Sequence, residues 1–190
     1  MSNAFIEIFH LIIQSATSLL VAACILRAYM IFIQLNMRSS SGNPIGQFVL
    51  NLTNWIVLPL RKIFPVVGKL DTSSILAAYL FCVAELILFS LIIRFNLPNQ
   101  LLLLVALGEL LKITFSVLTI LLLIYTITSW LSANSANIHF LDRLLSPLLN
   151  PIRKFLPLIG GIDFSPMVLF LLIQIVKILI NALIGESHSF

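Results

Sequence analysis

The sequence has few charged residues, and this shortage excludes an ordinary soluble protein. Asp, Glu, Lys and Arg together make up 9% of the 190 residues, whereas soluble domains have about 25%. Hydrophobic residues make up 60% of the chain, and the mean hydropathy is +1.12. A soluble domain of this length could not bury so much apolar surface, so the composition indicates a membrane protein.

Cysteine and histidine are also scarce, which excludes several kinds of functional site. Cys24 and Cys82 each lie in an apolar segment with no second cysteine nearby, so neither a CxxC redox pair nor a cysteine zinc site is expected. Only His10 among the three histidines lies near the first apolar segment, and one histidine cannot supply paired axial haem ligands. No nucleophile, base or metal cluster is spaced for catalysis, so we expect no cofactor and no enzymatic activity.

Four apolar segments are long enough to cross a bilayer, which requires about 20 residues. They are residues 9–33, 74–94, 101–130 and 165–184. Each is expected to be a helix, because an isolated strand would leave its backbone groups unpaired in lipid. The first residues lack the basic region of a signal peptide, so the first helix is expected to be retained. The fold class predicted is an all-α membrane protein with four transmembrane helices.

The basic residues lie mainly in the two long connections between the first and second and the third and fourth segments. Lys and Arg are retained on the cytoplasmic side of a membrane, so both connections are predicted to be cytoplasmic and both termini periplasmic. This clustering in loops differs from a DNA-binding face, and no nucleic-acid partner is expected. The basic residues of the two connections are Arg38, Arg61, Lys62, Lys69, Arg143, Arg153 and Lys154.

Each long connection also contains a segment in which apolar residues recur at intervals of three and four, as in an amphipathic helix. We expect these helices to lie along the cytoplasmic interface. Pro59, Pro147 and Pro151 should break or kink them into shorter pieces. The apolar positions are Ile45, Phe48, Val49, Leu52, Trp55 and Ile56 in the first connection, and Leu141, Leu144, Leu145, Leu148, Leu149, Ile152, Phe155 and Leu156 in the second.

An internal repeat relates the two halves of the chain. Residues 59–73 align without a gap to residues 151–165, with identical Pro, Arg, Lys, Pro, Gly, Asp and Ser. Abundant leucines cannot explain these identities, because they fall on polar and backbone-shaping residues. An even number of crossings separates the two copies, so they are predicted to be parallel repeats, residues 1–96 and 97–190, each with two spanning helices and one interfacial helix.

One interpretation of the repeated motif is a hinge that turns the chain from the interface into the membrane. Pro59 and Pro151 can start a short helix, a later proline ends it, and a glycine permits the turn. Asp71 and Asp163 suit the N-cap of the next spanning helix. The hinge residues in this interpretation are Pro59, Pro65, Gly68, Pro151, Pro157 and Gly160.

The alternative interpretation is a binding motif for a lipid head group, an ion or an acidic segment of a partner. Each Arg-Lys pair can bind anionic lipid, with about 1 kcal/mol per charge near the membrane surface. In this interpretation the two copies converge near the pseudo-two-fold axis. The residues concerned are Arg61, Lys62, Asp71, Arg153, Lys154 and Asp163.

A few charges lie inside the apolar segments. Glu85 and Lys177 occupy the same register of the repeat and should lie about 16 Å deep, where an isolated charge is costly. We predict that they pair with each other across the two-fold axis, and an ion or proton path through the bundle is the rival interpretation. Glu109 and Lys112 can meet on one helix face, and Arg27 can extend to the interface.

At the paired motifs, residues 59–73 and 151–166, the chain resembles the YggT family of bacterial membrane proteins, also called YlmG. The Gly-Gly-Ile-Asp-Phe-Ser-Pro run at residues 160–166 is particularly close to that family. The resemblance implies a multi-pass protein of the bacterial inner membrane, linked to osmotic-stress tolerance, envelope organisation or assembly of membrane cytochromes in plastids. It carries no enzymatic mechanism.

From this resemblance and the residues we expect a non-enzymatic scaffold or assembly factor. Its expected partners are anionic membrane lipids and another membrane protein, and a homo-oligomer stays open. The alternative is a component of an ion or osmolyte channel or transporter.

Overall fold

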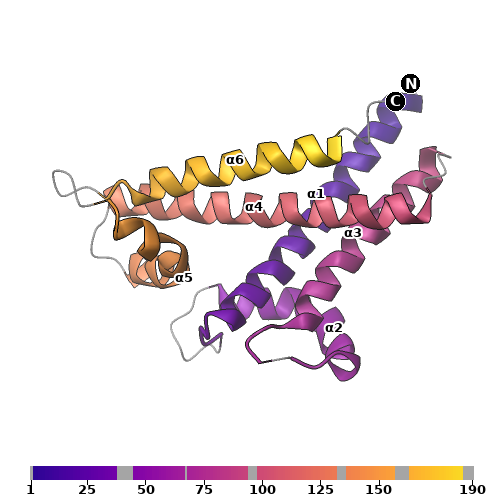
Figure 1. Ribbon diagram of the computed structural model, residues 1–190. Helices are drawn as coiled ribbons and strands as arrows, with labels where there is room; N and C mark the ends of the chain where they lie inside the picture. The colour runs from indigo at the N-terminus through magenta and orange to yellow at the C-terminus, as the bar shows by residue number, and fades with distance from the viewer. Residues whose placement is uncertain are drawn as a thin grey trace. The chain divides into compact units, whose positions relative to one another are not determined.

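The computed structural model describes residues 2–37, 45–66, 68–93, 98–131, 136–156 and 163–185, all of which lie in helices or short connections (Figure 1). These residues form six α-helices and no β-strand. The helices are α1 (Ser2–Phe32), α2 (Gly46–Ile63), α3 (Thr72–Ile93), α4 (Asn99–Leu131), α5 (Ala136–Arg153) and α6 (Ser165–Gly185).

Four of these helices are long and apolar enough to cross a membrane, as the sequence predicts. The candidate spans are Phe5–Phe32 in α1, Thr72–Ile92 in α3, Leu101–Trp130 in α4 and Ser165–Ala182 in α6. Large apolar side chains such as Leu91 and Ile178 are exposed on them. Lipid is the solvent that accommodates such surfaces, so the chain is a multi-pass membrane protein.

The chain divides into two compact units, Met1–Thr114 and Phe115–Phe190. The division therefore falls inside α4. The repeat boundary between residues 96 and 97 stays a prediction, because the two units are defined by how the chain packs, which does not test where its sequence repeats.

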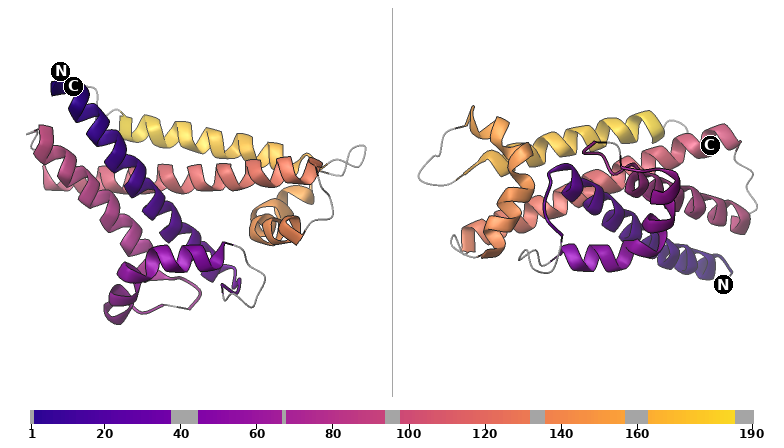
Figure 2. Two further views of the ribbon diagram at one scale, coloured as in Figure 1. Left: turned by 180° about the vertical axis from the view of Figure 1, so that it is seen from behind. Right: turned by 90° about the horizontal axis from the view of Figure 1, so that it is seen from below.

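In unit 1, α1 and α3 lie side by side and α2 lies across their ends (Figures 1 and 2). Small side chains on the facing surfaces, including Cys24, Ala77 and Ala78, allow the two spanning helices to approach closely. Ala106 and Leu110 in the first part of α4 belong to the same buried cluster.

In unit 2, α5 packs against α6 at one end (Figures 1 and 2). Helix α6 also contacts the second part of α4, where Lys177 Nζ donates a hydrogen bond to Ser116 Oγ. The buried residues Leu141, Leu144, Leu145 and Leu149 recur at intervals of three, one and four along α5. Arg143 and Asn150 are exposed on its other side. The buried leucine face explains why α5, which also carries polar residues on its other side, packs stably in unit 2.

The prolines do not end the connecting helices, so the prediction that they break them was wrong, whereas the predicted kinks stay a prediction. Helix α2 continues through Pro59, and α5 continues through Pro147 and Pro151. Neither Pro59 nor Pro151 starts a helix. All three prolines are exposed, so the missing hydrogen bond of each does not lie within the packed core of its unit.

Candidate functional site

The repeated motif forms the corner between α2 and α3 in unit 1, and an ion pair lies at its centre. Asp71 directly precedes α3 and its side chain is completely buried. Arg61 Nη2 donates a hydrogen bond of 2.6 Å to Asp71 Oδ2, and the Ser74 hydroxyl donates another of 2.6 Å to the same oxygen. The backbone carbonyl of Asp71 accepts from the Ser74 and Ile75 amides. The residue thereby connects α2 to the first turn of α3.

A second arginine reaches this corner from α1. Arg27 is only 2% exposed, and its Nε lies 3.8 Å from Asp71 Oδ2. Its Nη1 donates to Thr53 Oγ1 at 2.8 Å and to Asn54 Oδ1 at 2.9 Å, both on α2. Helix α2 covers Arg27 and supplies the oxygens that a buried guanidinium needs; the expectation that Arg27 extends to the interface stays a prediction. Three helices are joined through this one side chain.

The turn between α2 and α3 is held by hydroxyl groups and one glycine. Thr72 Oγ1 donates to the Pro65 carbonyl at 2.8 Å, and Ser73 Oγ donates to the Phe64 carbonyl. Pro65 follows the end of α2 at Ile63. Gly68 has φ +62°, a backbone conformation that glycine adopts without the steric cost of a Cβ. The chain therefore reverses direction over few residues.

The corresponding corner of unit 2 contains the same pair in the same order. Arg153 Nε donates to Asp163 Oδ2 at 2.8 Å, and Asp163 Oδ1 accepts from the backbone N–H of Ser165, the first residue of α6, at 2.9 Å. Arg153 Nη2 also donates to Asp142 Oδ1 at 3.0 Å and to the Tyr125 hydroxyl at 2.7 Å. One guanidinium thus joins α4, α5 and the start of α6.

These contacts shift the pKa values of the ion pair in unit 2. Partial burial works against the charged form of each group, but the hydrogen bonds outweigh it. The pKa of Asp163 is lowered below its usual value, because Ser165 and Arg153 donate to the carboxylate. The pKa of Arg153 is raised, because Asp163 and Asp142 stabilise the guanidinium. The folded state therefore favours the ionised form of both groups.

The two corners differ in the ratio of their charged groups. In unit 1, two arginines face one aspartate, Asp71. In unit 2, two aspartates face one arginine, Arg153. The repeated Arg and Asp are thus paired within each unit, whereas the additional charges, Arg27 and Asp142, come from different helices and have opposite signs.

Sequence reasoning identified Arg61, Asp71, Arg153 and Asp163 but not their pairing, and it did not single out Asp142. The shared separation of ten residues, Arg61 to Asp71 and Arg153 to Asp163, was the available signal. No comparable pattern in the sequence indicated that Thr53 and Tyr125 accept hydrogen bonds from the arginines of the corners.

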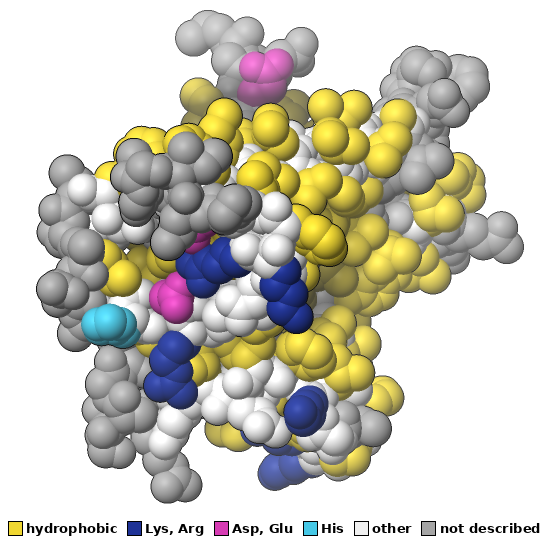
Figure 3. Space-filling view, turned by 60° about the vertical axis from the view of Figure 1, so that its left-hand side comes forward, with side chains coloured by type: hydrophobic (Ala, Val, Ile, Leu, Met, Phe, Trp, Pro, Cys, Tyr) yellow, Lys and Arg dark blue, Asp and Glu magenta, His cyan; other side chains and the backbone are white. Residues whose placement is uncertain are grey.

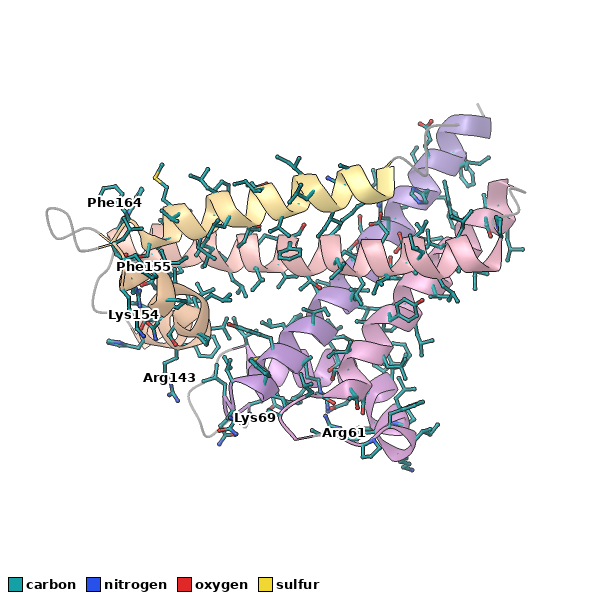
Figure 4. The ribbon with its side chains drawn as sticks, in the orientation of Figure 1. Arg61, Lys69, Arg143, Lys154, Phe155 and Phe164 are labelled. Carbon is teal, nitrogen blue, oxygen red and sulfur yellow. The ribbon has the colours of Figure 1, made fainter. Side chains whose placement is uncertain are left out.

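The remaining motif residues lie at the periphery of the corners. Lys62 and Lys154 are exposed, and Figure 4 shows Lys154 and Phe155 at the end of unit 2 where α5 meets α6. In the face drawn in Figure 3, Lys and Arg side chains lie near carboxylates, and hydrophobic side chains cover much of the remaining surface. Pro157 and Gly160, two of the hinge residues predicted from the sequence, lie outside the described residues.

The charges inside the spans have polar neighbours within their own units. Glu85 Oε2 accepts a hydrogen bond of 2.6 Å from Thr17 Oγ1 on α1, and Lys177 Nζ donates one of 3.3 Å to Ser116 Oγ on α4. The pairing of Glu85 with Lys177 joins two units that are described separately, and it stays a prediction. The pair of Glu109 and Lys112 is confirmed, with 2.8 Å between Oε1 and Nζ.

Comparison with known proteins gives a consistent family assignment. The sequence model of the CCB3/YggT family matches residues 6–92 and 104–184. The uncharacterized protein YggT of Escherichia coli (strain K12) is 39% identical over 136 residues, which are 71% of each chain. An uncharacterized protein of Haemophilus influenzae is 33% identical over 177 residues, 92% of this chain and 93% of the relative. No solved structure matches the chain. The matches cover both spanning pairs and both corners, and the chain belongs to the CCB3/YggT family.

Proposed function

We propose that this protein is a non-enzymatic scaffold or assembly factor of the bacterial inner membrane, whose two corners engage anionic lipid and a membrane-protein partner at the cytoplasmic face. The observation that carries the proposal is the ion pair in each corner, Arg61 with Asp71 and Arg153 with Asp163. Each pair fixes a connecting helix to the start of a spanning helix and leaves the adjacent lysine, Lys62 or Lys154, exposed. A rigid corner with an exposed cation suits binding at a membrane surface.

The exposed side chains of α2 support an interfacial position for this helix. Phe48, Trp55 and Leu58 are exposed beside the polar residues Gln47 and Asn51. Trp and other amphipathic side chains are favoured where hydrocarbon meets head groups. We therefore place α2, and by analogy α5, along the cytoplasmic surface of the bilayer.

The family match supports the proposed repeat and topology. Its two matched segments, residues 6–92 and 104–184, each contain two spanning helices with a connecting helix between them. Parallel units place both connecting helices on one side, and their Lys and Arg residues favour the cytoplasm. Both termini would then be periplasmic.

Photo-crosslinking in native membranes tests the proposed partnership. A crosslinking amino acid is placed at exposed positions in the two corners, Lys69 and Phe155, and in a lipid-facing control position, Leu91. The proposal predicts a discrete protein adduct from the corners that Leu91 does not give. Adducts only between copies of this chain would contradict a heterologous partner and favour a homo-oligomer.

A second candidate function, as part of an ion or osmolyte pathway, rests on Glu85. Its carboxylate lies within a membrane span and accepts a hydrogen bond from Thr17, and ionisable groups at such depth often mark ion paths. Reconstituted vesicles distinguish the two functions. A scaffold gives no flux above empty vesicles, whereas a pathway gives flux that Glu85→Gln reduces. The proposed link to osmotic-stress tolerance is compatible with either function.

A further inference from the structure

The corner of unit 1 has an excess of positive charge. Among the residues that the structure describes, Asp71 is the one carboxylate that Arg27 and Arg61 contact, so the ion-paired group keeps one formal positive charge. Lys62 adds another at the surface of α2, directly after Arg61 in the sequence. An excess cation at the edge of a low-dielectric region attracts an anion strongly.

The ion-paired group of unit 2 has the opposite balance. Arg153 is shared by Asp142 and Asp163, so this group keeps one formal negative charge. The exposed Lys154, directly after Arg153, brings the sum of the corner to zero, whereas the same count with Lys62 leaves two positive charges in unit 1. Three hydrogen bonds from Arg153 go to the protein itself, including the one to Tyr125. The helix end at each corner contributes a similar dipole, so the difference between the corners comes from their side chains.

A hollow in unit 1 lies beside the excess charge. It has a volume of about 520 Å³ and is lined by Leu58, Pro59, Arg61 and Lys62. The Arg61 side chain is 33% exposed, and among the described residues its one hydrogen bond goes to Asp71. The guanidinium therefore has donors left for an oxyanion, and Lys62 provides a second cation on the same helix turn.

The apolar part of the hollow identifies the class of anion. Leu58 is half exposed, and Ile63 and Phe64 are exposed just beyond the two cations. Water-soluble phosphate would gain nothing from this apolar surface, whereas an amphiphile with a phosphate group at its polar end would use both parts.

We propose that the hollow of unit 1 holds the phosphate of one anionic phospholipid in a defined site between Arg61 and Lys62. The corner of unit 2 contacts head groups at the membrane surface without such a site, so it does not retain a lipid through extraction. The proposal refines the lipid engagement described under the proposed function and rests on it. It makes the two halves of the chain functionally different although their backbone corners and Arg–Asp pairs are alike.

Lipid retention by the full-length protein tests this asymmetry, with Lys62→Gln and Lys154→Gln as a matched pair of variants at equivalent repeat positions. Each protein is reconstituted in nanodiscs with equal phosphatidylcholine and phosphatidylglycerol, and the retained lipids are counted by native mass spectrometry after extraction. Loss of one surface charge corresponds to about a fivefold change in affinity. We expect Lys62→Gln to reduce retained phosphatidylglycerol by about fivefold, and Lys154→Gln to leave it within a factor of two of the wild type.

One further variant and one competition measurement control for folding and for the source of the phosphate. The variant Lys62→Arg keeps the charge and should restore retention, which separates a lost contact from a lost fold. Inorganic phosphate at millimolar concentration should not displace the lipid. Displacement would overturn the assignment to a phospholipid and indicate a free-phosphate site.

The results that would overturn the lipid site of unit 1 differ from those that would overturn the proposed scaffold function. Equal losses in Lys62→Gln and Lys154→Gln would overturn the asymmetry and leave lipid engagement by both corners intact. No preference for phosphatidylglycerol in the wild type would overturn both the inference and the lipid part of the proposed function. The crosslinking to a protein partner reports on the scaffold independently of either result.

Discussion

Arg61 and Asp71 are ten residues apart in the chain, and their side chains are joined by a hydrogen bond of 2.6 Å across the corner between α2 and α3. Arg153 and Asp163 are joined over the same separation in unit 2. Such a pair restricts the path of the turn between a connecting helix and a spanning helix, because burial removes water from the charges and only their contact with each other offsets that cost.

Replacing the buried aspartate should destabilise unit 1 severely. The variant Asp71→Asn removes the carboxylate that faces Arg27 and Arg61. It leaves the buried Arg27 without a counter-charge and close to a second cation, the partly exposed Arg61. Breaking a buried ion pair from one side costs about 3 to 5 kcal/mol. Reversible unfolding in mixed micelles, followed by helical circular dichroism, should show a loss of this size.

The matched variant Asp163→Asn should have a much smaller effect. The Asp163 side chain is 21% exposed, and Arg153 keeps its contacts with Asp142 and Tyr125. We expect a loss of about 1 kcal/mol. Equal losses for Asp71→Asn and Asp163→Asn would show that the ratio of charges in each corner does not determine its stability.

The hydroxyl of Thr53 should matter because it accepts from a buried arginine. The variant Thr53→Val keeps the shape of the side chain but removes the acceptor for Arg27 Nη1, at a cost of about 1 to 3 kcal/mol. Thr126→Val is the control, because the Thr126 hydroxyl donates to the Leu122 carbonyl of its own helix. The same unfolding measurement should show a clear loss for Thr53→Val and little change for Thr126→Val; the reverse order would contradict a structural role for the Arg27 contacts.

The spans could be predicted from the sequence because long apolar segments have few alternatives in a membrane protein. The predicted third span, residues 101–130, coincides with the span found in α4, and the first differs by a few residues at each end. The lengths of α2 and α5 could not be predicted from local rules. Those rules treat a proline as a helix break, whereas Pro59, Pro147 and Pro151 lie on exposed helix surfaces where the missing hydrogen bond is tolerated.

The candidate site could be predicted only where the two halves of the chain repeat. Arg61 and Asp71 have identical counterparts in Arg153 and Asp163, and the repeat drew attention to them. Asp142 and Thr53 have no such counterparts. Their roles depend on how α2 and α5 pack, which is a tertiary property, and the opposite charge balance of the two ion-paired groups follows from it.

Acidification should weaken unit 2 through Asp163. The folded state lowers the pKa of this carboxyl, so the ionised form stabilises the fold. The contribution is fully present above the ordinary Asp pKa, near 4, and is lost as the pH falls through the lower folded value. The unfolding free energy of the wild type should therefore fall as the pH is lowered below about 4, and Asp163→Asn should show a shallower dependence. Identical slopes would contradict the lowered pKa.

Cysteine labelling should locate both corners on one side of the membrane. Cys24 and Cys82 are buried and can be replaced by alanine, after which Lys69→Cys and Lys154→Cys each introduce one exposed thiol. A membrane-impermeant maleimide should label both thiols in inside-out vesicles and neither in right-side-out vesicles. Labelling of the two positions from opposite sides would exclude parallel repeats, and with them the shared cytoplasmic surface.

A direct pairing of Glu85 with Lys177 makes a specific prediction about stability. Each side chain also has a neutral polar neighbour, Thr17 or Ser116, but a hydroxyl cannot neutralise a charge within a membrane span. If the two charges pair, Glu85→Leu and Lys177→Leu should each leave an uncompensated charge, and the double variant should be more stable than either single variant, with a coupling of about 1 to 3 kcal/mol. A double-mutant cycle measured by unfolding in micelles gives this coupling energy directly. Additive losses would instead mean that Glu85 and Lys177 do not contact each other and that each is accommodated within its own unit, because independent sites do not couple.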